Sequence, residues 1–379
     1  MMDNIWLASA LWVGLALASS LISMRLALSV ALVEIMVGAL GGNIIGMPLT
    51  PWINYLASFG AILLTFLAGA EVDPDVVRRN VGSTMTIGIM GFVAPYLGCF
   101  LMARYLLGWG WPQSQIAGIA LSTTSVAVVY AVMVETGLNK TEIGKIILAA
   151  CFVNDLGTVL ALGVVFANYN LWLVVFGVAT IAMCFALPSV APWYFKKVGR
   201  RVSEPDIKFL LLVLFALGGF AIAVKSEAVL PAYLVGMALA PTFKRDPELP
   251  HRMRVIAFAV LTPFYFLKAG SLVEANVLIT SAGLIVLFLG VKMVTKFVGI
   301  LPLTRFYKFE NREGMYTTLM MSTGLTFGTI SALYGYTNHI IDQTQYTILV
   351  VGVIGSAVVP TLIAQKWFLP KSAPAKQEV

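Results

Sequence analysis

The sequence predicts an all-α protein that crosses a membrane many times, and three observations lead to that class. First, 59% of the 379 residues are hydrophobic and only 11% are charged, whereas soluble domains carry roughly 25% charged residues. Second, apolar segments of about 20 residues, enough to cross a hydrocarbon core of about 30 Å as a helix, recur along the chain. Third, no stretch alternates apolar and polar residues as a membrane β-strand does. The spans are therefore expected to be helices.

Hydropathy divides the chain into thirteen candidate membrane helices. In order, they are residues 5–23, 27–46, 52–70, 82–106, 114–135, 141–167, 171–194, 206–224, 227–242, 252–270, 276–303, 314–336 and 343–369. The first segment lacks a basic start and an A-x-A cleavage site, which predicts a retained span and not a signal peptide. Cys99, Cys151 and Cys184 all lie inside apolar segments, where we expect them to pack against neighbouring helices.

The charges between these segments predict the orientation of the chain. If the thirteen segments alternate in direction, twenty of the 25 lysines and arginines fall on one side of the membrane. Two, Lys225 and Lys268, fall on the other side, and Arg104, Lys292 and Lys296 fall within spans. The positive-inside rule then places the N-terminus outside and the C-terminus inside. The net charge of +7 is loop charge facing anionic lipid, so nucleic acid is not an expected partner.

The thirteen segments divide into six, one and six, which predicts two inverted six-helix repeats joined by a linker helix. The fifth segment of each half carries small and polar residues at mid-membrane. They are Ser122, Thr123, Thr124 and Ser125 in the first half, and Ser322, Thr323, Gly324 and Thr326 in the second. Both segments are predicted to be interrupted helices, whose dipole ends would hold an ion at the midplane. Helix packing by small hydroxyl residues is the alternative.

One carboxylate, that of Asp155, lies near the centre of the sixth segment, in KIILAACFVNDLGTVLALGVVFA. A charge at this depth costs about 2.5–3.5 kcal/mol on insertion scales, so it predicts a functional role. With Asn154, it is interpreted as the ion-binding point of a secondary transporter. A carboxylate that accepts either a proton or a partly dehydrated alkali cation suffices for exchange, because the two ligands compete for one charge. A structural salt bridge between two helices is the alternative.

Two lysines of the eleventh segment, Lys292 and Lys296, are four residues apart and therefore share one helix face. Either could pair with the empty Asp155 carboxylate, and the Asp155/Lys296 pair is the one predicted. Snorkelling of Lys296 to the cytoplasmic interface is the alternative. The sequence has no P-loop, Rossmann, HExxH or serine-hydrolase signature, which argues against an enzyme and against nucleotide-driven pumping.

Three stretches resemble the membrane domain of monovalent cation/proton antiporters of the Kef-type and NapA-type branch. They are FLAGAEVDP, STTSVAVVYAVMVETGLNKTEIGKIILAACFVNDLGTVLAL and LMMSTGLTFGTISALYGYTNHIIDQTQYTILVVGVIGSAVVPTLIAQKWF. The resemblance implies an NhaA-like fold with two crossed, discontinuous helices in a mobile core, a static dimer scaffold and elevator-type alternating access. On this analogy residues 81–170 and 275–370 form the core, 1–80 and 200–270 form the scaffold, and 171–199 form the linker.

The resemblance also implies roles for individual residues. Asp155 corresponds to the essential ion- and proton-binding aspartate, Thr123, Thr124 and Ser125 lie in the first unwound stretch, and Lys296 lies where relatives have a basic residue. Lys292 has no counterpart in this comparison. Asn154 replaces the first of two adjacent aspartates, a pattern that goes with electroneutral exchange in the superfamily. The tail SAPAKQEV is too short for the nucleotide-binding regulatory domain of many Kef-type proteins.

The sequence therefore predicts a single antiporter domain over residues 1–379, located in the cytoplasmic membrane. It would exchange Na+ or K+ for H+ as a homodimer in contact with membrane lipid, with no resident cofactor. The expected ion ligands are Asp155, which binds the cation transiently, with Asn154, Thr123, Thr124, Ser125, Ser322, Thr323 and Thr326. A Na+-coupled symporter of organic anions, of the bile-acid-transporter type, is the alternative, and a channel or non-transporting sensor is a further rival.

Overall fold

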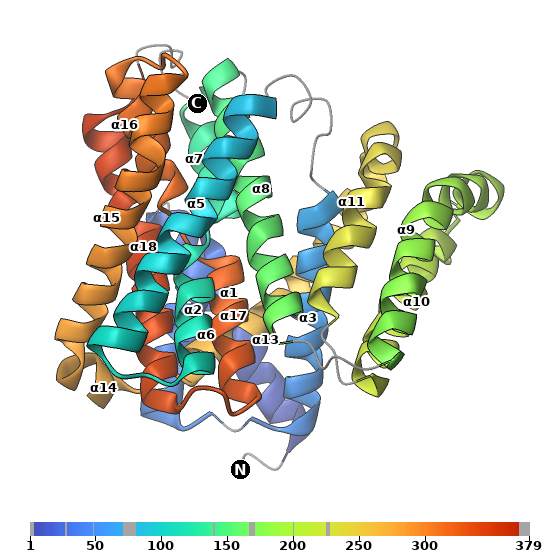
Figure 1. Ribbon diagram of the computed structural model, residues 1–379. Coiled ribbons are helices and arrows are strands. Elements are labelled where there is room, and N and C mark those ends of the chain that lie inside the picture. The colour runs from blue at the N-terminus through green and yellow to red at the C-terminus, as the bar shows by residue number, and fades with distance from the viewer. Residues whose placement is uncertain are drawn as a thin grey trace. The chain divides into compact units, whose positions relative to one another are not determined.

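The computed structural model describes residues 4–26, 29–47, 49–70, 81–138, 141–166, 171–199, 201–224 and 228–370, and every regular element in these ranges is a helix (Figure 1). The EVDP end of the first motif and the tail SAPAKQEV lie outside the described residues. Nine helical stretches of the described part are long and apolar enough to cross a membrane. The chain is accordingly a multi-pass, all-helical membrane protein.

The helices of the first half are α1 (Ile5–Leu26), α2 (Val30–Ile45), α3 (Pro51–Ala70), α5 (Val81–Leu101), the π-helical turn η1 (Met102–Leu106), α6 (Trp111–Ser122), α7 (Val126–Glu135) and α8 (Glu142–Val165). Then follows α9 (Leu171–Val198). The later helices are α10 (Pro205–Ala223), α11 (Val229–Arg245), α12 (Glu248–Ile256), the π-helical turn η3 (Ala257–Leu261), α13 (Thr262–Ser271), α14 (Ala275–Thr280), α15 (Ala282–Phe306), α16 (Asn311–Met321), α17 (Thr326–Thr337) and α18 (Gln343–Trp367).

Each of the thirteen predicted segments falls on helical structure, although several helix ends and interruptions differ. Helix α9 continues through Pro188 and Pro192 to Val198, four residues past the predicted end at residue 194. Prolines are tolerated in membrane helices because neighbouring groups satisfy the freed backbone carbonyls. The predicted helix at 252–270 begins earlier, at Glu248, and is interrupted by η3. The number of membrane crossings and the inverted repeat remain predictions.

Local sequence signals explain where two of the helices begin and end. The Ser29 hydroxyl accepts a hydrogen bond from the Leu32 N–H at the start of α2, and Gly46 ends this helix in the left-handed region at φ 66°. At the start of α18, the Asp342 carboxylate accepts from the Gln345 N–H, and the Gln345 side chain accepts from the Asp342 N–H. This capping box satisfies two free backbone donors and fixes the first residue of α18.

Helix starts recur at a nearly constant interval along the chain. Helices α6 and α16 begin at residues 111 and 311. Helices α7 and α17 begin at 126 and 326, and α8 and α18 begin at 142 and 343. The interval is therefore 200 or 201 residues for all three pairs. Two structural repeats of similar length would produce this spacing.

The chain folds into two compact units. The first contains Met1–Pro48, Asp75–Thr158 and Phe266–Val379, and the second contains Leu49–Pro74 and Val159–Tyr265. In the first unit, α5 packs against α6 and α15, α6 packs against α17, and α18 packs against α15, α16 and α17 (Figure 1). In the second unit, α11 packs against α3 and α9.

Glycines allow two helices of the second unit to pack backbone against backbone. A Cβ at Gly69 of α3 would overlap the carbonyl oxygen of Tyr233, and a Cβ at Gly236 of α11 would overlap the carbonyl oxygen of Phe66. Membrane helices depend on such close approach, because lipid tails supply little hydrophobic driving force for association between helices. The α3–α11 contact is therefore intolerant of side chains at both glycines.

We expect Gly236→Leu to destabilise the protein by about 1–3 kcal/mol or more, since its side chain would collide with a backbone carbonyl that no rotamer change can move. Thermal unfolding in detergent measures the effect. Gly219→Leu is the matched control, because Gly219 of α10 is exposed and a Cβ there has no atom within 4 Å. Equal unfolding midpoints for the two variants would contradict the proposed tight contact.

Candidate functional site

Two helices of the first unit are interrupted at the predicted positions, and their interruptions lie against each other. Residues 123–125 separate α6 from α7, and residues 322–325 separate α16 from α17. The N–H of Ser125 donates to the carbonyl oxygen of Thr323 at 3.0 Å. The Thr124 hydroxyl donates to the carbonyl oxygen of Met321 at 2.8 Å. The prediction of two interrupted helices is thus confirmed, and hydrogen bonds join the two interruptions directly.

Most hydroxyls of the two interruptions turn back onto the helix that precedes them. Ser122 donates to the carbonyl oxygen of Ile119 at 2.8 Å, and Thr123 donates to that of Ala120 at 3.2 Å. Ser322 donates to the carbonyl oxygen of Thr318 at 2.7 Å, and Thr323 donates to that of Met320 at 2.8 Å. These bonds satisfy carbonyls in the last turns of α6 and α16, which lack their usual partners. A hydroxyl that donates its hydrogen keeps its oxygen lone pairs, so each of the four can also serve as a cation ligand.

The two predicted ligands at the following helix starts differ in environment. The Ser125 hydroxyl oxygen accepts from the Val128 N–H at 3.4 Å and so caps the start of α7. Thr326 is the first residue of α17 and is partly exposed, whereas Thr123, Thr124, Ser322 and Thr323 are completely buried. Thr326 is therefore set apart by its exposure from the buried hydroxyls.

Asn154 of α8 closes the first interruption through both ends of its carboxamide. Its Oδ1 accepts a hydrogen bond from the Thr124 N–H at 2.9 Å, and its Nδ2 donates to the carbonyl oxygen of Ser122 at 3.4 Å. An ionised aspartate only accepts hydrogen bonds and could not make the second contact. An asparagine at this position is therefore matched to one free donor and one free acceptor of the interrupted backbone.

Asp155, the next residue of α8, is only 2% exposed, and its Oδ1 has no hydrogen-bond partner in the described part of the chain. The nearby Thr158 hydroxyl donates instead to the carbonyl oxygen of Asn154 at 3.1 Å. Buried polar atoms are nearly always hydrogen-bonded, so an exception of this kind needs an explanation such as an absent ion. Asp155 thus offers a carboxylate oxygen that is free to bind a cation or a proton.

Both lysines of α15 are completely buried, which rules out snorkelling of Lys296. The Lys296 ammonium donates to the Thr124 hydroxyl at 3.0 Å, and the same hydroxyl donates onward to Met321. Lys296 and Asp155 lie close enough for a Coulombic interaction. Among the described residues, however, they form no direct ion pair. The Asp155/Lys296 pair therefore remains a prediction for another state of the site.

Lys292 has different partners, one of which the sequence did not single out. Its ammonium donates to the carbonyl oxygen of Thr123 at 3.2 Å and to the hydroxyl of Ser356 at 2.8 Å. Ser356 is a buried residue of α18. A single serine in an apolar helix does not by itself indicate a functional residue. The regular interval between the two halves is the signal that could have identified Ser356.

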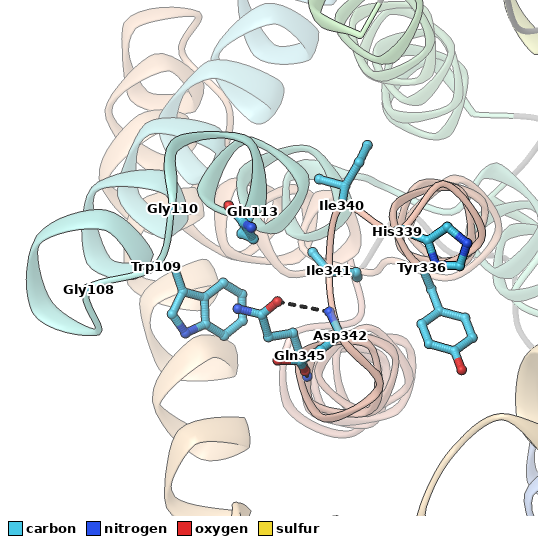
Figure 2. A pocket seen from close by; sticks show the side chains of 10 residues that line it. All are labelled: Gly108, Trp109, Gly110, Gln113, Tyr336, His339, Ile340, Ile341, Asp342 and Gln345. Atoms are coloured by element: carbon cyan, nitrogen blue, oxygen red, sulfur yellow. Dashed lines mark hydrogen bonds between the residues drawn. The ribbon is translucent and has the colours of Figure 1, made fainter.

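A pocket of about 530 Å³ lies elsewhere in the first unit, beside the starts of α6 and α18 and the end of α17 (Figure 2). It is lined by Gly108, Trp109, Gly110, Gln113, Tyr336, His339, Ile340, Ile341, Asp342 and Gln345. None of the predicted ion ligands lines it. Figure 2 shows Gln345 folded back onto the Asp342 backbone, as the capping box requires.

The site combines the oxygen ligands that hard monovalent cations prefer, because a carboxylate, hydroxyls and backbone carbonyls can replace a hydration shell. Asp155 supplies the negative charge, and the two interruptions place dipole ends and polar backbone groups next to it. The buried lysines add positive charge to the same cluster. This arrangement suits reversible binding of a small cation.

The fold of the chain is that of a known transporter. The chain superimposes on the structure of the sodium proton antiporter MjNhaP1 from Methanocaldococcus jannaschii at pH 8 with a TM-score of 0.70. The superposition covers 95% of this chain and 96% of the MjNhaP1 chain. The two sequences are 13% identical, so this similarity speaks for the fold alone.

Curated relatives match the chain over most of its length. It is 25% identical over 351 residues to a probable Na+/H+ antiporter 3 of Methanocaldococcus jannaschii, covering 88% of each chain. It is 24% identical over 358 residues to the probable Na+/H+ antiporter GerT of Bacillus cereus, covering 92% of this chain and 95% of the relative. The model of the family described as sodium/hydrogen exchanger, transmembrane, matches residues 10–368. The resemblance predicted from the motifs is confirmed at the level of the superfamily, and the chain belongs to the sodium/hydrogen exchanger family.

Proposed function

We propose that the protein is a secondary antiporter that exchanges a monovalent cation, Na+ or K+, for H+. The observation that carries this proposal is the unpartnered carboxylate oxygen of Asp155, buried beside two interrupted helices. The names of the relatives support the same activity, since those compared above are described as Na+/H+ antiporters. No enzymatic step and no resident cofactor are required.

Competition at one carboxylate couples the two ions. A cation reaching the site loses part of its water to Asp155 and to nearby hydroxyl and carbonyl oxygens, and a proton displaces it by neutralising the same carboxylate. Lys296 stays protonated throughout and offsets the charge of the empty carboxylate from its place on the Thr124 hydroxyl. The site has the same net charge with a cation bound as with a proton bound, so one-for-one exchange is electroneutral.

Alternating access completes the proposed cycle. Residues 81–170 and 275–370 would move as a core against a dimer scaffold of residues 1–80 and 200–270, with 171–199 as the linker. The interval of 200 or 201 residues between corresponding helices supports two repeats, and the excess of basic residues on one side supports an N-terminus outside and a C-terminus inside. We place the protein as a homodimer in the cytoplasmic membrane.

A Na+-coupled organic anion symporter, the alternative considered from the sequence, is less well supported. The relatives compared above are named as antiporters. Such a symporter would take up solute in response to Na+ without coupled proton movement, so the same liposomes used below distinguish the two functions.

We expect Asp155→Asn to abolish exchange, because the neutral side chain can neither attract a cation nor take up a proton. In proteoliposomes with a preset pH gradient, addition of Na+ or K+ should dissipate the gradient for the native protein and not for this variant. Glu34→Gln is the matched control, since Glu34 of α2 is another carboxylate that is 2% exposed but lies outside the site. Undiminished exchange by Asp155→Asn would refute the assignment.

The rate of Na+/H+ exchange should not depend on membrane potential, because a single carboxylate carries one cation in one direction and one proton in the other. Valinomycin with equal K+ on both sides clamps the potential at zero. We expect the initial Na+-driven rate to be the same with and without the clamp. An increase of several-fold under the clamp would show that net charge moves and that the stoichiometry is not one-for-one.

Removal of the Asn154 side chain should weaken both the fold and transport. Asn154→Ala leaves the Thr124 N–H and the Ser122 carbonyl unpaired, at a cost of about 1–3 kcal/mol for each buried group. The unfolding temperature in detergent and the exchange rate should both fall. Asn338→Ala is the control, since the Asn338 carboxamide bonds the Tyr334 carbonyl on an exposed surface. Native stability in Asn154→Ala would show that these two hydrogen bonds do not hold the interruption.

A further inference from the structure

Lys292 is a completely buried basic residue that the proposed exchange cycle does not use. Its ammonium contacts oxygen atoms of two segments and lies against a third. It donates to the Thr123 carbonyl at 3.2 Å and to the Ser356 hydroxyl at 2.8 Å, and a Cβ at Gly324 would overlap its Nζ. The Ser356 hydroxyl donates in turn to the Val353 carbonyl at 2.7 Å, and it lies 3.4 Å from the Gly324 carbonyl oxygen. Lys292 thus touches both interruptions and α18.

The place that Lys292 fills is the second-half counterpart of the proposed cation site. Asp155 lies thirteen residues after the first residue of α8, at 142, and Ser356 lies thirteen residues after the first residue of α18, at 343. Thr124 and Gly324 occupy the same position in the two interruptions, 200 residues apart. Ser356 and Gly324 therefore correspond to Asp155 and Thr124.

Each of the two lysines lies at one of these two positions. Lys296 donates to Thr124, and its charge interacts with that of Asp155. Lys292 bonds Ser356 and lies against Gly324. Because the Lys292 side chain ends among oxygen atoms, its ammonium meets the same chemical surroundings that a dehydrated alkali cation would seek. The absence of a side chain at Gly324 provides the room for it.

We infer that Lys292 is a tethered cation that permanently occupies the counterpart of the cation site and leaves one place for a soluble ion. It is a positioning residue: its ammonium binds the Thr123 carbonyl just after the end of α6, where positive charge is favourable, and lies against Gly324 of the second interruption. Serine at position 356 suits this role, because its hydroxyl accepts from the ammonium without adding a second negative charge. The inference rests on the proposed function, since it presupposes a cation site at Asp155.

Replacing Lys292 and placing a carboxylate at position 356 should create a second cation site. Equilibrium binding of radiolabelled Na+ to purified full-length protein measures the number of ions bound per chain. We expect one for the native protein, two for Lys292→Met/Ser356→Asp, and one for the same double variant carrying Asp155→Asn. Ser356→Asp alone is the matched control and should still bind one, because Lys292 neutralises the new carboxylate. A purely structural lysine would leave the number at one in the double variant.

Two results would overturn the inference. One is a folded, monodisperse double variant that binds a single Na+, and the other is a second Na+ bound by Ser356→Asp while Lys292 is present. If the native protein binds no cation, or Asp155→Asn leaves its binding unchanged, the proposed function itself fails, which is a different outcome.

If the double variant does not fold, Lys292→Met tests the same inference. Lys292→Met alone should unfold at a lower temperature than the native protein, and added NaCl or KCl should restore the midpoint more than choline chloride does, because a small cation can enter the vacated place. Equal effects of the three salts would contradict the tethered-cation role.

Discussion

The hydrogen bonding of two broken backbones inside a membrane protein is the constraint on which the rest of the site depends. Helix interruptions at membrane depth free N–H and C=O groups that lipid cannot satisfy, so other parts of the protein must do so. Here the interruptions bond each other through Ser125 and Thr323, and Asn154 pairs with both a donor and an acceptor of the first interruption. Thr124 links α16 to Lys296 through one hydroxyl.

This solution uses nearly every polar group of the cluster except the one needed for transport. The Asn154 carboxamide, the Thr124 hydroxyl and both ammonium groups have partners, whereas Asp155 Oδ1 has none in the described part of the chain. A buried, unpaired acceptor is costly in a low-dielectric interior, and binding of a cation or a proton relieves that cost. Either ligand can relieve it, so the proposed exchange needs only this one carboxylate.

The fold and part of the site could be predicted from the sequence because they depend on local composition. Length and hydropathy place a helix in each predicted segment, and clustered hydroxyls, joined by Gly324 in the second half, locate both interruptions. The pairing pattern could not be predicted in this way. Lys292 and Lys296 are one turn apart on one face, yet their ammonium groups meet different partners, 64 to 172 residues away along the chain. Such contacts depend on how α15 packs, which no local pattern reports.

The sequence by itself therefore determined an all-helical membrane protein of the sodium/hydrogen exchanger family, with a carboxylate at the depth of two interrupted helices. Hydrophobicity over about 20 residues and the cost of an intramembrane charge are properties of the chain alone. Only the tertiary structure decided that Lys296 binds Thr124 and not Asp155, and that Ser356 receives Lys292. The physical reason is that a buried ammonium goes to the nearest set of oxygen atoms, and helices distant in sequence bring those atoms together.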